Sequence, residues 1–288
     1  MAHRLAISIV IPNYNYSNFL EDLLSSINGS THRSSIQIII VDGGSTDNSK
    51  SVADAYLKPQ DKLVCEPDDG QADAIAKGLT MADGRWFMFQ NSDDMFNINA
   101  LDDFVESHST GVEEVVAYDQ ETLLDNGSNL RHFSSFRHLY PVRWRQMFVN
   151  IYYTNQSTIY STKLAQKIGF DKSFRFALDY DFAVRFFKAV NPRVKLVRAV
   201  LGIQRLHENT KTSTMQDVCQ IETKFVKDRE FTLSDRVIGV AQAAFYHALK
   251  VFFYRFAAKR DAIPPEWGAT RPEQPASNIR ESGKRCGR

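Results

Sequence analysis

Short apolar runs alternate with segments of mixed polarity over the first hundred residues. The apolar runs predict buried strands at residues 6–11, 36–41, 62–65 and 86–90. Between them, apolar residues recur every three or four positions, which predicts helices at residues 19–27, 46–56 and 71–81. Strands that alternate with helices pair in parallel through right-handed crossovers. We therefore expect an α/β fold with a Rossmann-like, mostly parallel sheet flanked by helices.

The second half of the chain follows a less regular pattern. It predicts strands at residues 115–124 and 194–203, a hairpin turn at 125–128, and helices at 162–168 and 182–190. A long amphipathic helix is expected from about residue 234 to residue 260. Residues 263–288 hold several prolines among polar residues, so we expect this tail to lack fixed structure.

Polar clusters follow three of the expected strands, at residues 13–15, 42–45 and 91–94. The carboxyl ends of parallel strands lie at one edge of a sheet, where α/β proteins bind ligands, so we expect the clusters to meet there. The adjacent carboxylates of Asp93 and Asp94 repel each other unless a cation or strong donors hold them. Mg²⁺ or Mn²⁺ suits such oxygen ligands, and a solvated acidic turn that caps the next helix is the alternative.

Composition adds only a few constraints. The 288 residues are 43% hydrophobic and 24% charged, which is ordinary for a soluble protein. The formal net charge of +1 gives no overall attraction for nucleic acid. Cys65, Cys219 and Cys286 lack the spacing of a zinc site or a disulfide framework. The sequence shows neither a signal peptide nor a membrane-spanning apolar stretch, so we expect a cytoplasmic protein.

Five motifs follow one another along the chain. They are ISIVIPNYN, IIIVDGGSTDNS, EPDDGQADAIAKGL, NSDD and NQSTIYSTKLAQKIGFDKSFRFALDYDFAVRF. In order and spacing, from roughly residue 5 to residue 210, they resemble the family-2 inverting glycosyltransferases, which have the GT-A fold. The resemblance implies a metal-dependent enzyme that moves a sugar, with inversion, from a nucleoside-diphosphate sugar to an acceptor hydroxyl.

The resemblance also implies an organisation into parts. A GT-A domain is expected over residues 1–215, with a nucleotide-sugar half at 1–105 and an acceptor half at 106–215. A C-terminal helical extension is expected at residues 216–262. The implied partners are a nucleotide-sugar donor and a sugar or lipid-linked saccharide acceptor. Assembly of a surface polysaccharide or glycolipid is the setting by analogy with the family.

Seven residues match positions at which the family binds its nucleotide sugar: Pro12, Tyr14, Asn15, Asp42, Asp69, Lys77 and Asp93. The turn at residues 12–15 resembles the one that cradles the base. Gly43 departs from the family because many members carry a second Asp there, and Ala76 stands where relatives often have Asn. The alternative role for Asp42 is that of a turn former.

The expected metal ligands are Asp94, Asp93 and His207. The two acids match the family's DXD-type motif, in which Asp94 binds the metal and Asp93 holds ribose or a metal-bound water. A histidine at the place of His207 often completes the metal shell, and an exposed loop histidine is the alternative. Arg205 and Lys211 are candidates for meeting phosphate charge nearby.

Asp179 matches the family's catalytic base. An inverting transfer needs one carboxylate within about 3 Å of the attacking hydroxyl to take its proton. Family members usually have Glu immediately before this Asp, whereas this chain has Leu178, a pattern that resembles a related branch. Two acids at a helix start, Asp179 and Asp181, are also compatible with capping alone. We take Asp179 as the base and Asp181 as a structural neighbour.

Three other classes of protein fit the sequence less well. A nucleotidyltransferase typically has a Gly-rich basic loop after the first strand, where this chain has residues 12–15, PNYN. A catalytically silent sugar-nucleotide-binding protein keeps Asp93 and Asp94 but needs no Asp179. A dinucleotide oxidoreductase needs a G-x-G-x-x-G motif after the first strand, and the sequence has none there.

The expected C-terminal helix has an apolar face made by Ile238, Ala241, Phe245, Leu249, Phe252 and Phe256. Three cationic residues lie toward its end: Arg255, Lys259 and Arg260. These features suit a helix lying in the plane of the membrane, on its inner face and near a lipid-linked acceptor. Packing against the catalytic domain or in a homo-oligomer is the alternative.

Overall fold

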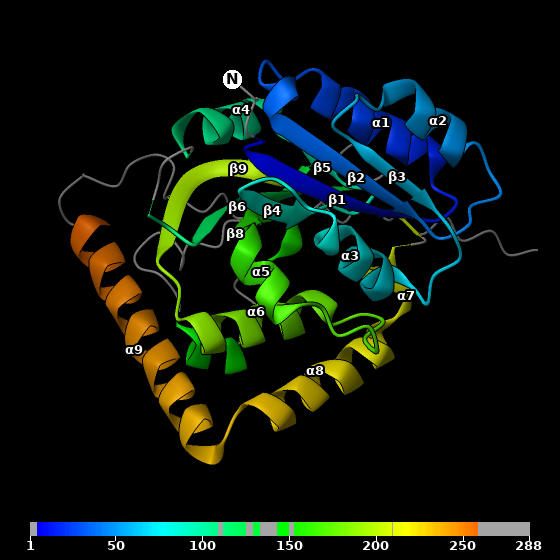
Figure 1. Ribbon diagram of the computed structural model, residues 1–288. Coiled ribbons are helices and arrows are strands. Elements are labelled where there is room, and N and C mark those ends of the chain that lie inside the picture. Colours follow the sequence, from blue (N-terminus) through cyan, green and yellow to red (C-terminus); the bar gives the residue numbers. More distant parts are fainter. Residues whose placement is uncertain are drawn as a thin grey trace, which may run out of the picture. The chain divides into compact units, whose positions relative to one another are not determined.

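The computed structural model describes residues 5–108, 112–124, 129–132, 143–149, 153–208 and 210–258. In these residues nine strands form one sheet, with helices on both of its faces (Figure 1). The strand order is β3-β2-β1-β4-β8-β6-β9-β5, and β7 pairs with β6 beside this path. The expected α/β fold, a Rossmann-like sheet flanked by helices, is confirmed.

The N-terminal half of the sheet is parallel. Its strands are β1 (Ile7–Asn13), β2 (Ile36–Asp42), β3 (Lys62–Cys65) and β4 (Trp86–Phe89). β1 pairs in parallel with both β2 and β4, and β2 pairs in parallel with β3. Every residue of β1 and β2 is buried, as expected for central strands covered on both faces.

Helices cover the two faces of the sheet in separate groups (Figure 1). One face carries α1 (Ser17–Asn28), α2 (Ser49–Tyr56) and α4 (Ile98–Ser107). The other carries α3 (Gln71–Thr80), α5 (Thr162–Ile168) and α6 (Leu178–Val190). Alternating side chains of β1 divide between two cores, since Ile9 packs into the first and Val10 into the second.

The C-terminal half of the sheet is mixed. Its strands are β5 (Met95–Phe96), β6 (Val115–Leu124), β7 (Asn129–His132), β8 (Thr158–Ser161) and β9 (Val194–Leu206). β6 pairs in parallel with β9, whereas β8 runs antiparallel to β4 and β6, β5 to β9, and β7 to β6. The turn predicted at residues 125–128 lies outside the described residues, and the strands on either side of it pair antiparallel.

Helix α6 begins at Leu178, four residues before the predicted start. Leu178, Phe182 and Phe186 are all nearly inaccessible to solvent, so one apolar face runs through the whole helix. The acids Asp179 and Asp181 therefore lie within its first turn.

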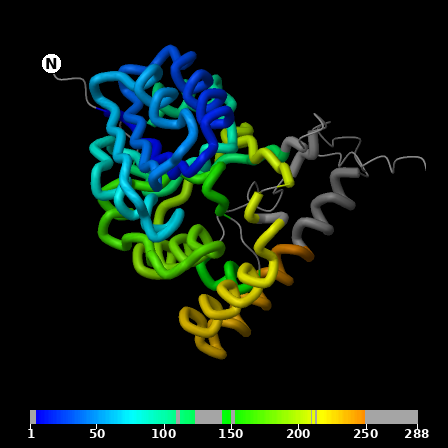
Figure 2. Tube along the Cα trace, turned by 90° about the vertical axis from the view of Figure 1, so that its right-hand side faces the viewer, coloured from blue at the N-terminus to red at the C-terminus, as the bar shows by residue number. Residues whose placement is uncertain are grey.

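Two helices follow the sheet, α8 (Gln216–Glu230) and α9 (Leu233–Ala258). Short helices connect other elements: η1 (Arg33–Ser35), η2 (Trp144–Phe148), η3 (Asn155–Ser157) and α7 (Lys211–Thr214). α8 runs alongside α6 (Figures 1 and 2). The chain divides into compact units at residues 1–243 and 244–288, so α9 begins in the first unit and ends in the second.

Two expectations concern the tail of the chain and membrane-spanning helices. The tail predicted to lack structure, residues 263–288, lies outside them. Within them, every helix is too short or too polar to cross a bilayer.

Candidate active site

A cavity of about 760 Å³ opens at the carboxyl ends of the parallel strands. Its wall includes residues after β1, β2 and β4, so the three polar clusters meet as the sequence predicts. The opposite wall comes from η3, the start of α6 and the end of β9. This volume is typical of a small-molecule site.

Asp42 organises the turn that ends β2. One of its carboxylate oxygens accepts hydrogen bonds from the backbone N–H groups of Gly44 (3.1 Å) and Ser45 (2.7 Å). The other accepts from Asn13 Nδ2 (2.8 Å) and Ser45 Oγ (2.7 Å). Asp42 is only 4% exposed, and it does not line the cavity. Its observed contacts are those of a turn former that joins the ends of β1 and β2.

Asn15 makes a second connection between the same two loops. Its Oδ1 accepts a hydrogen bond from the backbone N–H of Thr46 (2.8 Å), and its own backbone N–H donates to Ser45 Oγ (2.8 Å). Its φ of 55° lies in the left-handed region, which Asn tolerates better than most residues. Asn15, like Asp42, shapes the wall from behind, whereas Pro12 and Tyr14 lie on it.

Asp68 was missed by the sequence reasoning, and it lines the cavity beside Gly43. A Cβ added to Gly43 would lie 2.8 Å from Asp68 Oδ2, so the carboxylate of Asp68 would have to move to make room for a side chain. The carboxylate of Asp68 therefore occupies the space that a side chain at position 43 would need. Burial raises the pKa of Asp68. The signal in the sequence was the glycine itself, at a position where the resemblance led us to expect an acid.

Asp69 and Lys77 lie away from the cavity wall. Asp69 is exposed, and Lys77 forms ion pairs with Glu66 (3.0 Å) and Asp73 (3.1 Å) that bind α3 to the preceding loop. Neither residue lines the cavity, so the structure does not bring them together with Pro12 and Tyr14. Their contact with a donor stays a prediction.

Asp94 is almost completely buried at the base of the cavity. Its carboxylate accepts hydrogen bonds from Asn91 Nδ2 (3.0 Å), Gln156 Nε2 (2.9 Å) and the backbone N–H of Arg205 (3.0 Å). Burial, together with the negative charge of Asp93, raises the pKa of Asp94. A buried carboxylate beside a second carboxylate is costly to ionise, and a bound cation would offset that cost.

His207 closes over Asp93 from the end of β9. Its Nε2 lies 3.1 Å from Asp93 Oδ2, and its ring stacks on Phe19 at a centroid distance of 4.9 Å. At 9% exposure it differs from the exposed loop histidine of the alternative interpretation. The structure therefore brings Asp93, Asp94 and His207 into one neighbourhood.

The three side chains do not form a complete metal cage. Within the described part of the chain, no group of three or more His, Cys, Asp or Glu side chains is arranged to hold a metal ion. The oxygen-rich pair Asp93–Asp94 nevertheless fits Mg²⁺ or Mn²⁺, which bind through one or two carboxylates and take further ligands from substrate phosphates. Such a site would be completed by a diphosphate.

Arg205 and Lys211 differ in how they meet the cavity. The guanidinium of Arg205 lies 3.2 Å from Asp22 and stacks over Phe19, so its charge is engaged outside the cavity. Lys211 Nζ donates to Gln71 Oε1 (2.7 Å) and to the carbonyl of Arg175 (3.1 Å) at the cavity wall. Lys211 is therefore the better placed of the two to meet phosphate charge.

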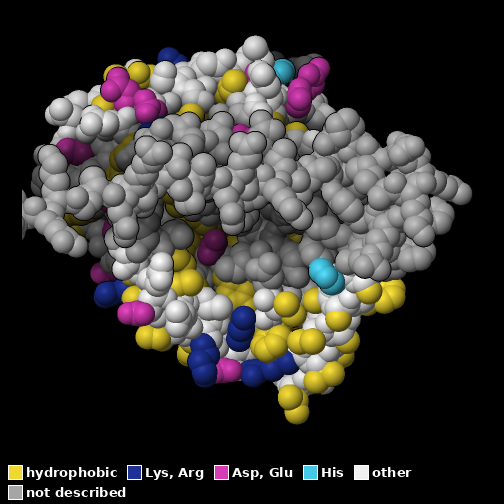
Figure 3. Space-filling view, turned by 180° about the vertical axis from the view of Figure 1, so that it is seen from behind, with side chains coloured by type: hydrophobic (Ala, Val, Ile, Leu, Met, Phe, Trp, Pro, Cys, Tyr) yellow, Lys and Arg dark blue, Asp and Glu magenta, His cyan; other side chains and the backbone are white. Residues whose placement is uncertain are grey.

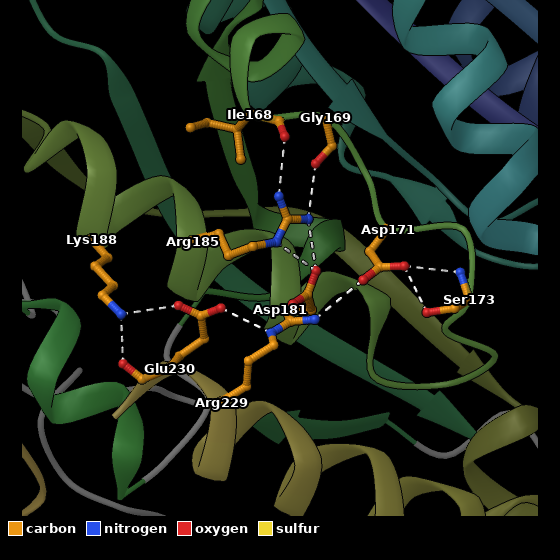
Figure 4. A network of polar contacts seen from close by, with 9 residues as sticks. All are labelled: Ile168, Gly169, Asp171, Ser173, Asp181, Arg185, Lys188, Arg229 and Glu230. Carbon is orange, nitrogen blue, oxygen red and sulfur yellow. Dashed lines mark hydrogen bonds and ion pairs between the residues drawn. The ribbon is translucent and has the colours of Figure 1, made fainter. Parts of the chain in front are cut away.

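The two acids in the first turn of α6 have separate environments. Asp179 lines the cavity, and its position away from bulk water raises the pKa of its carboxyl group to about 6. Asp181 is 1% exposed and accepts hydrogen bonds from Arg185 (2.7 and 2.9 Å) and from Arg229 of α8 (Figure 4). Asp181 joins α6 to α8, as the sequence reasoning expected of a structural neighbour.

The fold and the cavity define a class: an α/β protein of the GT-A type, with acids from both halves of the chain around one cavity. Residues 8–178, more than half of the chain, match the family described as Glycosyl transferase family 2. The chain belongs to this family, which confirms the expected family and fold.

Solved structures with the same fold support this assignment. TarS of S. aureus, residues 1–349 in complex with UDP-GlcNAc, superposes with a TM-score of 0.60 at 21% identity, over 75% of this chain and 65% of that one. The mannosyltransferase PcManGT of Pyrobaculum calidifontis, in complex with GDP-Man and Mn²⁺, gives a TM-score of 0.58 at 16% identity, over 89% and 81%.

A curated relative extends the similarity in sequence. An uncharacterized glycosyltransferase of Rickettsia prowazekii is 26% identical over 224 residues, which cover 72% of this chain and 66% of the relative. The chain spans between 34% and 66% of the length of the first curated relatives that it matches.

Proposed function

We propose that this protein is an inverting glycosyltransferase that moves a sugar from a nucleoside-diphosphate sugar to an acceptor hydroxyl. One observation carries the proposal: Asp179, with its pKa raised to about 6, lines the same cavity as the pair Asp93–Asp94. A general base and a site for the charged leaving group are the minimum that an inverting transfer needs.

The reaction is a single in-line displacement. The acceptor oxygen forms a bond to the anomeric carbon as the bond from that carbon to the diphosphate oxygen breaks, and the nucleoside diphosphate leaves with the electron pair. Asp179 takes the proton of the attacking hydroxyl. A carboxylate with a pKa of about 6 is mostly ionised at neutral pH and is a stronger base than an ordinary carboxylate.

Asp94, Asp93 and His207 are the residues that would hold Mg²⁺ or Mn²⁺. When bound, the ion supplies positive charge to the departing diphosphate. Lys211 lies at the cavity wall, where its ammonium group would meet the same phosphates.

The donor nucleotide is proposed to lie along the wall made by Pro12, Tyr14, Gly43 and Asp68. Tyr14 is 59% exposed, so its ring is available to pack against a base. Both carboxylate oxygens of Asp42 already accept two hydrogen bonds each, which leaves Asp68 as the acid available to a base from the cavity side. The solved structures of similar fold hold a UDP-sugar and a GDP-sugar.

The catalytic domain is proposed to span residues 1–215, with donor and acceptor halves at 1–105 and 106–215. The helical extension is proposed at 216–262. In the first compact unit, Gly239 packs against the backbone of Arg145, while the predicted apolar face points outward, with Ile238 and Ala241 both exposed. Among the described residues of the first unit, this face of α9 is therefore left largely open to solvent.

The exposed face of α9 is proposed to bind the inner surface of the cell membrane, where a lipid-linked saccharide would be the acceptor. Leu233, Val237 and Val240 are at least half exposed on the same helix. Figure 3 shows hydrophobic side chains gathered beside lysines and arginines on the face that it presents. Apolar side chains beside cations suit a surface of anionic lipid. The protein is thus proposed to bind the membrane peripherally and to help synthesise a polysaccharide or glycolipid in the cytoplasm.

A screen of nucleotide sugars tests the proposed function. The purified chain is incubated with UDP-, GDP-, dTDP-, CDP- and ADP-sugars and Mg²⁺ or Mn²⁺, and release of the nucleoside diphosphate is measured. We expect release from one base class, and an Asp94→Ala variant prepared in parallel should release none. Absence of both nucleotide binding and release with every donor would contradict the proposal.

A further inference from the structure

Helix α8 contacts the segment that leads into α6. The carboxylate of Glu222 accepts hydrogen bonds from three consecutive backbone N–H groups: those of Arg175 (2.8 Å), Phe176 (2.9 Å) and Ala177 (2.8 Å). Glu222 lies 44 residues beyond the segment that matches the family, which ends at residue 178. A residue outside the segment that matches the family thus binds the backbone near the end of that segment, at residues 175–177.

The N–H of Ala177 belongs to the cap residue of α6 and is one that a helix start leaves without a partner, whereas those of Arg175 and Phe176 lie in the segment just before the helix. The cap residue of α6, Ala177, offers no side-chain hydrogen bond, so its own side chain does not bind these three N–H groups. A carboxylate does so with charge-assisted bonds and also lies favourably against the positive end of the helix dipole.

Further contacts fix α8 in place beside this helix start. Arg229 donates to Asp181 in the first turn of α6 and to Asp171 in the preceding loop (3.2 Å) (Figure 4). Phe225 of α8 lies against Phe174, with ring centroids 6.1 Å apart. Glu222 is therefore presented by a helix that cannot move freely away from residues 171–181.

We propose that Glu222 is a positioning residue for the reaction: it fixes the backbone of residues 175–177 and thereby the place of the Asp179 carboxylate opposite the donor. Asp179 follows Ala177 by two residues, so a shift of this backbone moves the carboxylate with it. Glu222 touches neither donor nor acceptor and acts only through the helix start. The inference rests on the proposed function, in which Asp179 is the base.

The test compares Glu222→Ala and Glu222→Gln with Glu230→Gln in the full chain. Glu230 is a matched control because it lies on the same helix and pairs with Lys188 (3.1 Å) and Arg229 (2.9 Å), away from residues 175–177. Displacing a reacting group by about 1 Å costs on the order of 100-fold in rate. We expect kcat of Glu222→Ala to fall about 10- to 100-fold, with KM for the donor and the Kd of the nucleoside diphosphate within about twofold.

The Gln variant keeps one acceptor oxygen, so its kcat should lie between those of the Ala variant and the wild type. Glu230→Gln should keep the wild-type kcat. A loss in Glu222→Ala that appears equally in kcat and in nucleotide affinity would show a general loss of structure and overturn the proposal. So would a kcat equal to that of Glu230→Gln.

Hydrogen exchange provides a measurement that does not depend on turnover. In Glu222→Ala the amides of residues 175–181 should exchange faster, whereas those of β1 and β2 should be unchanged. Unchanged exchange at residues 175–181 overturns the positioning role even if the enzyme is active. A wild-type chain that binds and turns over no nucleotide sugar instead contradicts the proposed function, so the two failures are distinguishable.

Discussion

The two walls of the cavity are built in different ways. The proposed donor wall, lined by Pro12, Tyr14, Gly43 and Asp68, is held by contacts between loops that follow neighbouring parallel strands. Asn13 bonds to Asp42, and Asn15 bonds to Thr46, between the ends of β1 and β2. The catalytic wall begins at α6, whose start is held by Glu222 and Arg229 of a helix far along the chain. The proposed donor wall is thus fixed by loops of the sheet itself, while the wall that carries Asp179, the proposed base, depends on contacts with α8.

This difference predicts that donor binding and turnover can be separated. Changes at the ends of β1, β2 and β4 should act on nucleotide or metal affinity. Changes at the start of α6 should act on the rate at saturating donor. Each prediction below tests one side of that division.

The largest effect should come from removing the divalent cation. Excess chelator should abolish turnover, and Mg²⁺ or Mn²⁺ should restore it, because the ion would neutralise charge on the departing diphosphate. Since the described chain has no complete cage, calorimetry should detect tight Mn²⁺ binding only when nucleoside diphosphate is present. Full activity in excess chelator would show that the acids do not serve a metal.

The next largest effect should come from Asp179→Asn. Turnover should fall by roughly 10²–10⁴-fold, the usual contribution of a positioned base, with the Kd of the nucleotide unchanged. Asp181→Asn is the matched comparison in the same helical turn. It should lower the melting temperature, because it disrupts the buried contacts with Arg185 and Arg229, and affect the rate far less. The reverse pattern of rates would assign the base to Asp181.

A smaller effect is expected on the donor wall. Asp68→Asn should weaken nucleotide binding by roughly 10- to 100-fold, which corresponds to the loss of about 1.5–3 kcal/mol for a hydrogen bond to a charged group, and leave kcat nearly unchanged. Asp69→Asn changes the neighbouring acid in the same way and should have less effect, because Asp69 lies outside the cavity wall. If Asp69→Asn alone weakens binding, the assignment made from the sequence holds, and Asp68 only fills space beside Gly43.

The smallest effect on chemistry should come from the exposed face of α9. The double variant Val237→Asp, Val240→Asp should no longer float with anionic liposomes at low salt, while turnover with a soluble acceptor should persist. Val112→Asp, at a valine that is 69% exposed elsewhere, is the control and should float like the wild type. A wild-type chain that does not float, and that sediments as a dimer only when Val237 and Val240 are intact, would assign this face to a second subunit.

The contrast between the two walls also explains which strands could be predicted from the sequence. The parallel half was predictable because each strand is a short apolar run followed by a polar turn, and parallel pairing gathers such turns at one edge. The brief strands β5 and β8 were not predicted, since two to four residues carry too little periodicity to distinguish them from loop. Yet β5 matters, because its pairing with β9 brings the backbone of Arg205 to Asp94.

Some side chains of the site could be predicted from the sequence, and others could not. The neighbourhood of Asp93, Asp94 and His207 could be predicted by resemblance, whereas the stacking of His207 on Phe19 joins residues 188 positions apart. Asp68 was not predicted because its carboxylate lies beside Gly43, where the glycine leaves space for it, and this proximity is visible only in three dimensions. Glu222 was missed for a similar reason, since a glutamate on a polar helix gives no local signal that it caps another helix.

The pH dependence of kcat tests the central claim most directly, because it reports the ionisation of the base in the complex with donor. Asp179 must be ionised to accept the proton, and its raised pKa places its protonation near pH 6 instead of near 4. The kcat of the wild type should therefore fall as the pH decreases through about 6, and the residual activity of Asp179→Asn should lack this acidic limb. A wild-type kcat that stays constant through this range, or a limb that persists in Asp179→Asn, would contradict the account.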